Sequence, residues 1–279
     1  MNIVITGANG FVGQGLVRKL FTHSFIGSTR ITHLTLVDRY FNLNDLPTHT
    51  PTIEMSTGDL SNKQWLHNTL STRPIDVLYH LASIPGGMAE THPELAQQVN
   101  IEATVQLLNI CRYQMETTQR RAKFIFASSI AVFGKMPELV TDDTPLHPQM
   151  SYGVHKVIGE MMVSDYNRRG WIDGQSLRLP GVLARPPQKT GQLSTFLSDM
   201  VTDVSQGKTF VCPMSAGSRI WASSLPNVIY NLIHSATLSK ESLHGDTTFS
   251  LPTCCFSMSE LVDAIKMLSI LLIINLILE

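Results

Sequence analysis

Hydrophobic and polar positions follow two alternating rhythms along the first 180 residues. Short, almost continuous apolar runs predict buried strands, and longer segments with an apolar residue every three or four positions predict helices. Such alternation is typical of an α/β fold with a parallel sheet between layers of helices. The predicted strands span residues 2–6, 31–37, 52–56, 75–81, 123–127 and 174–179.

The predicted helices span residues 10–21, 62–70, 93–115 and 151–169. Ser61 and Ser151 are the expected N-caps of the helices at 62–70 and 151–169. A serine hydroxyl at the start of a helix can accept a hydrogen bond from an N–H group of the first turn. Beyond Pro180 the segments shorten and prolines interrupt them. We therefore expect a doubly wound parallel sheet in residues 1–180 and a smaller substrate-binding lobe in residues 181–279.

The end of the chain is unusually apolar, from Met267 to Leu278. A membrane-spanning helix needs about 20 apolar residues, so this run is too short to be one. We expect residues 270–278 to be ordered against an apolar surface, in a buried terminal helix or in a contact between subunits.

Composition narrows the class of partner. Hydrophobic residues make up 43% of the 279 positions, and the formal net charge is −1 without a long block of one sign. This excludes nucleic acid as the expected main partner and favours a small-molecule substrate. No ligand spacing predicts a metal site, and the N-terminus shows no signal-peptide pattern. The four cysteines form no C-x-x-C pair; they are Cys111, Cys212, Cys254 and Cys255. Together with the N-terminal pattern this predicts reduced thiols in the cytoplasm. The short apolar run at the end of the chain predicts no membrane association.

A glycine-rich turn joins the first predicted strand to the first predicted helix. Gly7 allows a tight turn, Gly10 allows the backbone to approach a pyrophosphate, and Gly13 allows the helix to pack closely on the strand. The unpaired N–H groups of the helix start attract the anion. This strand–turn–helix context predicts a Rossmann domain whose dinucleotide contacts also include the intervening residues, Asn9, Phe11 and Val12.

The second predicted strand is followed by an acidic residue, Asp38. A carboxylate there accepts hydrogen bonds from the adenosine ribose hydroxyls and repels a 2′-phosphate, so NAD is expected ahead of NADP. Arg39 leaves the choice partly open, because an arginine can pair with that phosphate.

Tyr152 and Lys156 are four residues apart in a predicted helix, so their side chains share one face. A tyrosine of ordinary pKa, about 10, is a poor base at neutral pH. A nearby ammonium and a positively charged oxidised nicotinamide favour the phenolate, which can then accept the proton of a substrate hydroxyl during hydride transfer. Ser128 and Ser129 follow the fifth strand, where loops meet ligands in doubly wound sheets. We expect a hydroxyl of this pair to hold the substrate oxygen beside Tyr152, with Lys156 as the third catalytic residue.

Together these segments resemble the extended short-chain dehydrogenase/reductases, which include NAD-dependent epimerases and dehydratases. The resemblance extends to about Asn231 and rests on the glycine turn and on residues 58–60, 80–83, 99–100, 128–134, 152–156 and 178–180. It matches Ser129, not Ser128, to the catalytic serine. It also implies a homodimer and further cofactor contacts at Asp59, Leu60, Leu81, Ala82, Ser83, Asn100, Tyr152, Lys156 and Leu179.

Within that family the chain is similar to D-erythronate dehydrogenases, on residues 84–90, 151–159 and 178–182. The resemblance implies oxidation of a small sugar acid at C2, with the substrate hydroxyl between Ser129 and Tyr152. A buried carboxylate needs a partner. Arg219 is our first candidate because its planar fork matches a carboxylate, and the loop at Gly86 and Gly87 is the second.

Two other functions stay open at this point. The first is a nucleotide-sugar epimerase or dehydratase, which uses the same scaffold. The second is a non-catalytic role as an NAD-binding protein. Family members typically run longer, and the apolar run after Lys266 differs from their last segment. A truncated or frame-shifted reading frame is one explanation.

Overall fold

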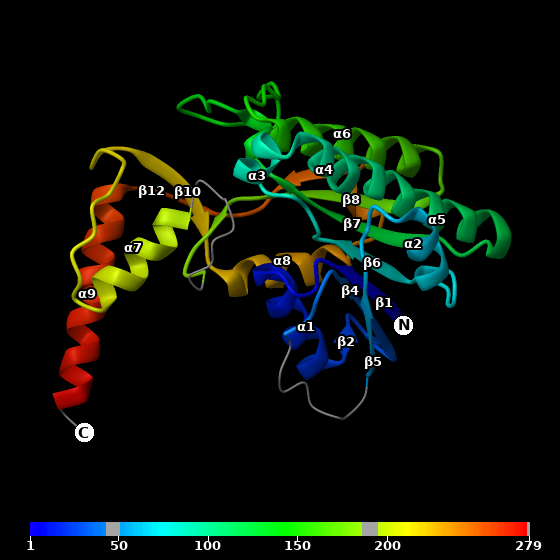
Figure 1. Ribbon diagram of the computed structural model, residues 1–279, viewed down its shortest axis with the longest axis horizontal. Coiled ribbons are helices and arrows are strands. Elements are labelled where there is room, and N and C mark those ends of the chain that lie inside the picture. The colour runs from blue at the N-terminus through cyan, green and yellow to red at the C-terminus, as the bar shows by residue number, and fades with distance from the viewer. Residues whose placement is uncertain (43–50, 186–194, 278–279) are drawn as a thin grey trace.

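The computed structural model describes residues 1–42, 51–185 and 195–277, with side chains from 196 to 268 in the last part. Seven parallel strands form its main sheet, in the order β11-β8-β7-β6-β1-β4-β5. The predicted α/β Rossmann fold is therefore confirmed (Figure 1). The strands are β1 (Asn2–Thr6), β4 (His33–Asp38), β5 (Thr52–Thr57), β6 (Val77–His80), β7 (Ala122–Ser129), β8 (Ile172–Leu179) and β11 (Thr248–Ser250).

The strand order changes direction between β1 and β6. After β1 the chain adds β4 and β5 on one side, and then returns to place β6 and the later strands on the other. The loops that leave β1 and β6 diverge here, which opens a crevice at the carboxyl ends of the strands where doubly wound folds bind ligands.

Helices cover both faces of this sheet, so its strands are apolar on both sides. One face packs against α1 (Phe11–His23) and α8 (Leu225–Ser235), which lie side by side in Figure 1. The other face packs against α2 (Lys63–Leu70), α5 (Ala103–Thr118) and α6 (Ser151–Arg168). The buried side chains that fill the two layers include Leu16, Leu20, Val228 and Leu232 on the first face, and Leu66, Leu107, Phe124 and Val163 on the second.

Both predicted serine caps are wrong. Asn62 caps α2 by accepting a hydrogen bond from the Trp65 N–H, while the Ser61 hydroxyl donates to Asp59. Helix α6 begins after Met150 without a side-chain cap, and the N–H of Ser151 donates to Glu90 at 2.7 Å. A carboxylate from a neighbouring helix therefore replaces the local cap, which a sequence pattern does not reveal.

The long helix expected at 93–115 is divided. Its parts are α4 (Pro93–Gln97), the π-helical turn η1 (Gln98–Glu102) and α5. A short helix, α3 (Gly86–Thr91), precedes it and replaces the loop expected at the two glycines. The small hairpin of β2 (Phe25–Ile26) and β3 (Thr29–Arg30) was not predicted.

A second, three-stranded sheet has the order β12-β10-β9 and packs with α7 (Thr195–Ser205) and α9 (Met258–Ile277). Its strands are β9 (Gly181–Val182), β10 (Arg219–Ser223) and β12 (Cys254–Ser257). The chain does not stay in this part, because α8 and β11 return to the main sheet. The domain division at residue 180 stays a prediction.

Helix α9 continues beyond the end of α7 in Figure 1. The predicted apolar packing of residues 270–278 involves side chains outside the described part of the structure. Within residues 1–42, 51–185 and 195–277, no helix is long and apolar enough to cross a membrane.

Candidate active site

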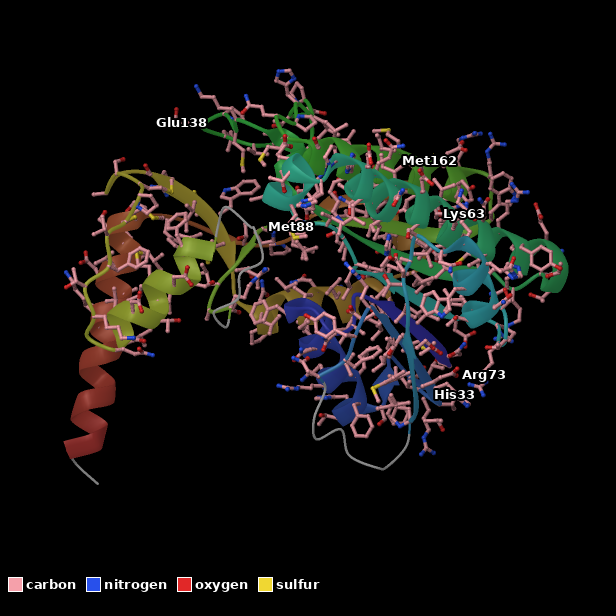
Figure 2. All side chains as sticks on the ribbon, in the orientation of Figure 1. His33, Lys63, Arg73, Met88, Glu138 and Met162 are labelled. Atoms are coloured by element: carbon pink, nitrogen blue, oxygen red, sulfur yellow. The ribbon has the colours of Figure 1, made fainter. Side chains whose placement is uncertain are left out.

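A cavity of about 840 Å³ opens at the carboxyl ends of β6, β7 and β8. Its inner wall carries Ser129, Tyr152 and Lys156, and residues of the three-stranded sheet form its opposite wall. Figure 2 shows Glu138, another lining residue, on the loop that projects between the turn η2 (Ile130–Phe133) and α6. Both parts of the chain thus contribute to one site, as expected for a substrate pocket beside a dinucleotide fold.

The glycine turn has the geometry that a pyrophosphate requires. Gly7 has a φ of +71°, and a Cβ there would lie 2.7 Å from the Ala82 nitrogen. A Cβ on Gly13 would lie 2.1 Å from the Gly7 carbonyl oxygen, so only glycine lets α1 start this close to β1. Helix α1 begins at Phe11 after the N-cap Gly10, which supplies no side-chain cap, so the N–H groups of the first turn are left for an anion.

Asp38 lies at the end of β4, beside the turn. Its carboxylate accepts hydrogen bonds from the N–H groups of Asn9, at 2.8 Å, and Arg39, at 2.7 Å. Burial raises the pKa of Asp38, and these two hydrogen bonds oppose the rise. The carboxylate is therefore fixed next to the turn, where a ribose would lie, and Val12 and Leu81 reach the cavity from the same side. These residues fit NAD.

Tyr152 and Ser129 are brought together by α6 and the end of β7. The hydroxyls of Ser129 and of Ser83, which follows β6, both act on the phenol of Tyr152. Burial raises the pKa of Tyr152, while these two hydroxyls and the charge of Arg185 lower it. Burial thus outweighs these groups, so the phenolate needs the additional positive charge of an oxidised nicotinamide.

Lys156 lies on α6 one turn after Tyr152, with its ammonium nitrogen 5.4 Å from the centroid of the Tyr152 ring. The ammonium donates to the Ala127 carbonyl oxygen at 2.7 Å. Burial lowers the pKa of Lys156 to about 7, although the charge of Glu160 opposes this. The predicted shared helix face is therefore present.

The adjacent serines have separate environments. Ser128 is buried and donates to Glu160, whose carboxylate also accepts two hydrogen bonds from Arg178, at 3.0 and 2.8 Å. Both serines line the cavity, but Ser129 is the one whose hydroxyl acts on the phenol of Tyr152. The structure thus brings Ser129, not Ser128, to the phenol.

Other expected cofactor residues line or support the crevice. Leu81 and Leu179 line the cavity, and Ala82 meets Gly7. The carboxylate of Asp59 accepts from the N–H and the hydroxyl of Ser61, and Leu60 is buried.

Asn100 holds the backbone beside the site. Its side-chain amide accepts from the Ile84 N–H at 2.7 Å and donates to the Ile84 carbonyl at 3.0 Å. This contact fixes the segment that carries Ser83, one residue before. Asn100 thus positions the backbone beside the site, and its contact with the cofactor stays a prediction.

The candidate carboxylate partners lie in different places. Arg219, at the start of β10, lines the cavity but is exposed, and its guanidinium donates to the carbonyl oxygen of Cys255 at 3.2 Å. Gly86 lines the cavity, whereas Gly87 is not among its lining residues.

Sequence reasoning missed Arg185 and the contact of Ser83 with Tyr152. Arg185 lies after β9 and lines the cavity, with its guanidinium carbon 5.3 Å from the Phe11 ring centroid. The only available signal was a basic residue shortly after the sixth predicted strand. From the sequence, Ser83 is expected only as a cofactor contact. Within the described ranges, no group of three or more histidine, cysteine or acidic residues could hold a metal ion.

The fold and the site together define an enzyme that uses a nicotinamide dinucleotide. The chain belongs to the NAD dependent epimerase/dehydratase family, whose model matches residues 3–221. NAD is accordingly its cofactor.

Two similar proteins are both named D-erythronate dehydrogenase. The chain is 34% identical over 253 residues to that of Haemophilus influenzae, covering 90% of this chain and 77% of the relative. It is 33% identical over 273 residues to that of Cupriavidus necator, covering 95% and 81%. A solved structure described as a nucleoside-diphosphate-sugar epimerase, from Agrobacterium tumefaciens, has a TM-score of 0.87 and 30% identity, covering 93% of this chain and 76% of that one.

Proposed function

We propose that the protein is an NAD-dependent dehydrogenase that oxidises the C2 hydroxyl of a small sugar acid such as D-erythronate. The observation that carries this proposal is the grouping of Ser129, Tyr152 and Lys156 on the wall of one cavity next to the glycine turn. The names of the two relatives support the substrate class.

In this mechanism Ser129 holds the substrate hydroxyl and Tyr152 accepts its proton. When bound, NAD accepts the hydride that leaves C2, so the alcohol becomes a 2-oxo acid. The phenolate becomes a phenol in the same turnover, and its proton then passes to solvent. Lys156 supplies positive charge beside the Tyr152 ring and would also hold the nicotinamide ribose, while its bond to Ala127 keeps the ammonium in position.

A panel of sugar acids and nucleotide sugars, each offered with NAD, tests the proposal through the absorbance of NADH. Turnover of a four-carbon 2-hydroxy acid, with formation of the 2-oxo acid, is the expected result. Net NADH formation only with nucleotide sugars would contradict it.

A nucleotide-sugar epimerase or dehydratase is the second candidate. The likeness to the structure described as a nucleoside-diphosphate-sugar epimerase favours it. An epimerase regenerates its NAD within each cycle, so it converts a sugar without accumulating NADH. A protein that binds NAD but turns over none of the panel would instead be non-catalytic.

We also propose that the chain forms a homodimer in the cytoplasm. Helix α6 exposes an apolar stripe of Val154, Ile158 and Met161, which is suited to a second copy. The four cysteines are free thiols, as a reducing compartment requires. Sedimentation tests this assembly. The wild type should sediment as a dimer and the double variant Ile158→Glu/Met161→Glu as a monomer. A monomeric wild type would contradict the proposed dimer.

A further inference from the structure

The cavity wall carries two arginine side chains in different surroundings. Arg219 is exposed, and the groups that act on its charge are Cys255 and Glu260. Arg185 is half-buried, and its guanidinium lies over the ring of Phe11 in the glycine turn. The charge of Arg185 acts on Tyr152, whereas Arg219 is absent from the groups that act on the phenol.

The chemistry of a 2-hydroxy acid restricts where its carboxylate can lie. The carboxylate carbon is bonded directly to the carbon that carries the reacting hydroxyl. When that hydroxyl lies between Ser129 and Tyr152, the carboxylate must lie beside Tyr152 as well. A cation that binds it must therefore be close enough to act on the phenol too.

We propose that Arg185, and not Arg219, binds the substrate carboxylate and thereby selects acids whose hydroxyl is adjacent to the carboxylate. This inference rests on the proposed function and adds the regiochemistry of its substrate. A guanidinium offers two parallel N–H groups to the two oxygens of a carboxylate, which fixes the orientation of C2 as well as its position.

The surroundings of Arg185 support this orientation. Its own N–H donates to the hydroxyl of Ser198 on α7 at 3.1 Å, so α7 holds the backbone from which the side chain extends. The Phe11 ring supports the guanidinium from the cofactor side. Arg185 thus joins Phe11 of the glycine turn to the cavity that Tyr152 lines, where a bound carboxylate would be held beside the reacting hydroxyl.

The test compares D-erythronate with its uncharged amide, D-erythronamide, in Arg185→Ala and in the matched variant Arg219→Ala. Calorimetry measures the affinity of each ligand for the enzyme–NADH complex, so the readout does not depend on turnover. Arg185→Ala is expected to weaken D-erythronate binding by about 10- to 100-fold, as when a hydrogen-bonded charge is lost. The amide and NADH affinities should change by less than about threefold, because neither ligand presents this carboxylate.

Arg185→Lys should recover part of the acid affinity, because it restores the charge without the planar fork. Three results would overturn the inference: an acid-specific loss in Arg219→Ala instead, an equal loss for acid and amide in Arg185→Ala, or an equal loss of NADH affinity. If the wild-type enzyme oxidises no sugar acid, the proposed function itself is wrong. The wild-type assay gives this result before any variant is made.

Discussion

The ammonium of Lys156 donates a hydrogen bond to the carbonyl oxygen of Ala127 at 2.7 Å. This bond fastens α6 to the end of β7. Tyr152 lies one turn earlier on α6, and Ser129 lies two residues after Ala127 in β7. One buried contact therefore fixes the relative position of the two hydroxyl groups that we expect to hold the substrate oxygen.

The depressed pKa of Lys156 has a consequence for stability. Burial lowers this pKa from 10.5 to about 7, so between these values the unfolded chain binds a proton that the folded chain does not. The unfolding free energy therefore contains a contribution that increases as pH rises through this range. We expect the apo wild type to gain stability relative to Lys156→Met between pH 7 and about pH 9, measured by thermal unfolding. Lys135→Met, at an exposed lysine, should show no such trend; a pH-independent difference for Lys156→Met would contradict the expectation.

Removing the phenolic oxygen should affect chemistry and spare binding. Tyr152→Phe is expected to lower kcat by about 10²- to 10⁴-fold, because a general base contributes this much. The dissociation constant for NADH should stay close to the wild-type value. Tyr166→Phe, on the same helix but hydrogen-bonded to Asn109, is the matched control and should retain activity. Near wild-type turnover by Tyr152→Phe would rule out the assigned base.

The two adjacent serines should separate function from stability. Ser129→Ala removes the hydroxyl beside Tyr152, so we expect kcat to fall by about 10-fold or more with little change in unfolding free energy. Ser128→Ala removes a donor to the buried Glu160 and should cost about 1–3 kcal/mol of stability. Denaturant titration and steady-state kinetics of both variants provide the comparison, and the reverse pattern would refute the assignment of Ser129.

Cofactor preference should depend on Asp38. Asp38→Asn keeps the size of the side chain but removes the charge that repels a 2′-phosphate, so the ratio of kcat/KM for NAD over NADP should fall by about 10-fold. The measurement is steady-state kinetics with both cofactors. Equal efficiency of the wild type with NAD and NADP would show that Asp38 does not select the cofactor.

The parts of the fold that could be predicted depend on local patterns. Strand β1 and the turn through Gly7 and Gly13 are specified by residues close together in the chain, and so is the pair of Tyr152 and Lys156. The caps could not be predicted, because Glu90 reaches the start of α6 from another helix.

The same limit applies to the site. Ser83 and Arg185 reach the cavity beside Tyr152 only because β6 and β8 flank β7 in the sheet, so the segments that follow these strands surround the same cavity. A lone arginine after a strand looks like a surface residue until the tertiary structure places it on the cavity wall. The three-stranded sheet escaped prediction because its strands are short and widely separated in sequence.

The edge strand β11 can join the main sheet only late in the synthesis of the chain. Residues Thr248–Ser250 pair with β8 only after the ribosome has made the whole of β9, β10 and α8. Until then the nascent chain presents β8 as an open edge, whose unpaired N–H and carbonyl groups can recruit another strand. A chain that stops before Thr248 keeps this edge permanently, so the yield of native protein is sensitive to premature termination even though the catalytic residues are already present.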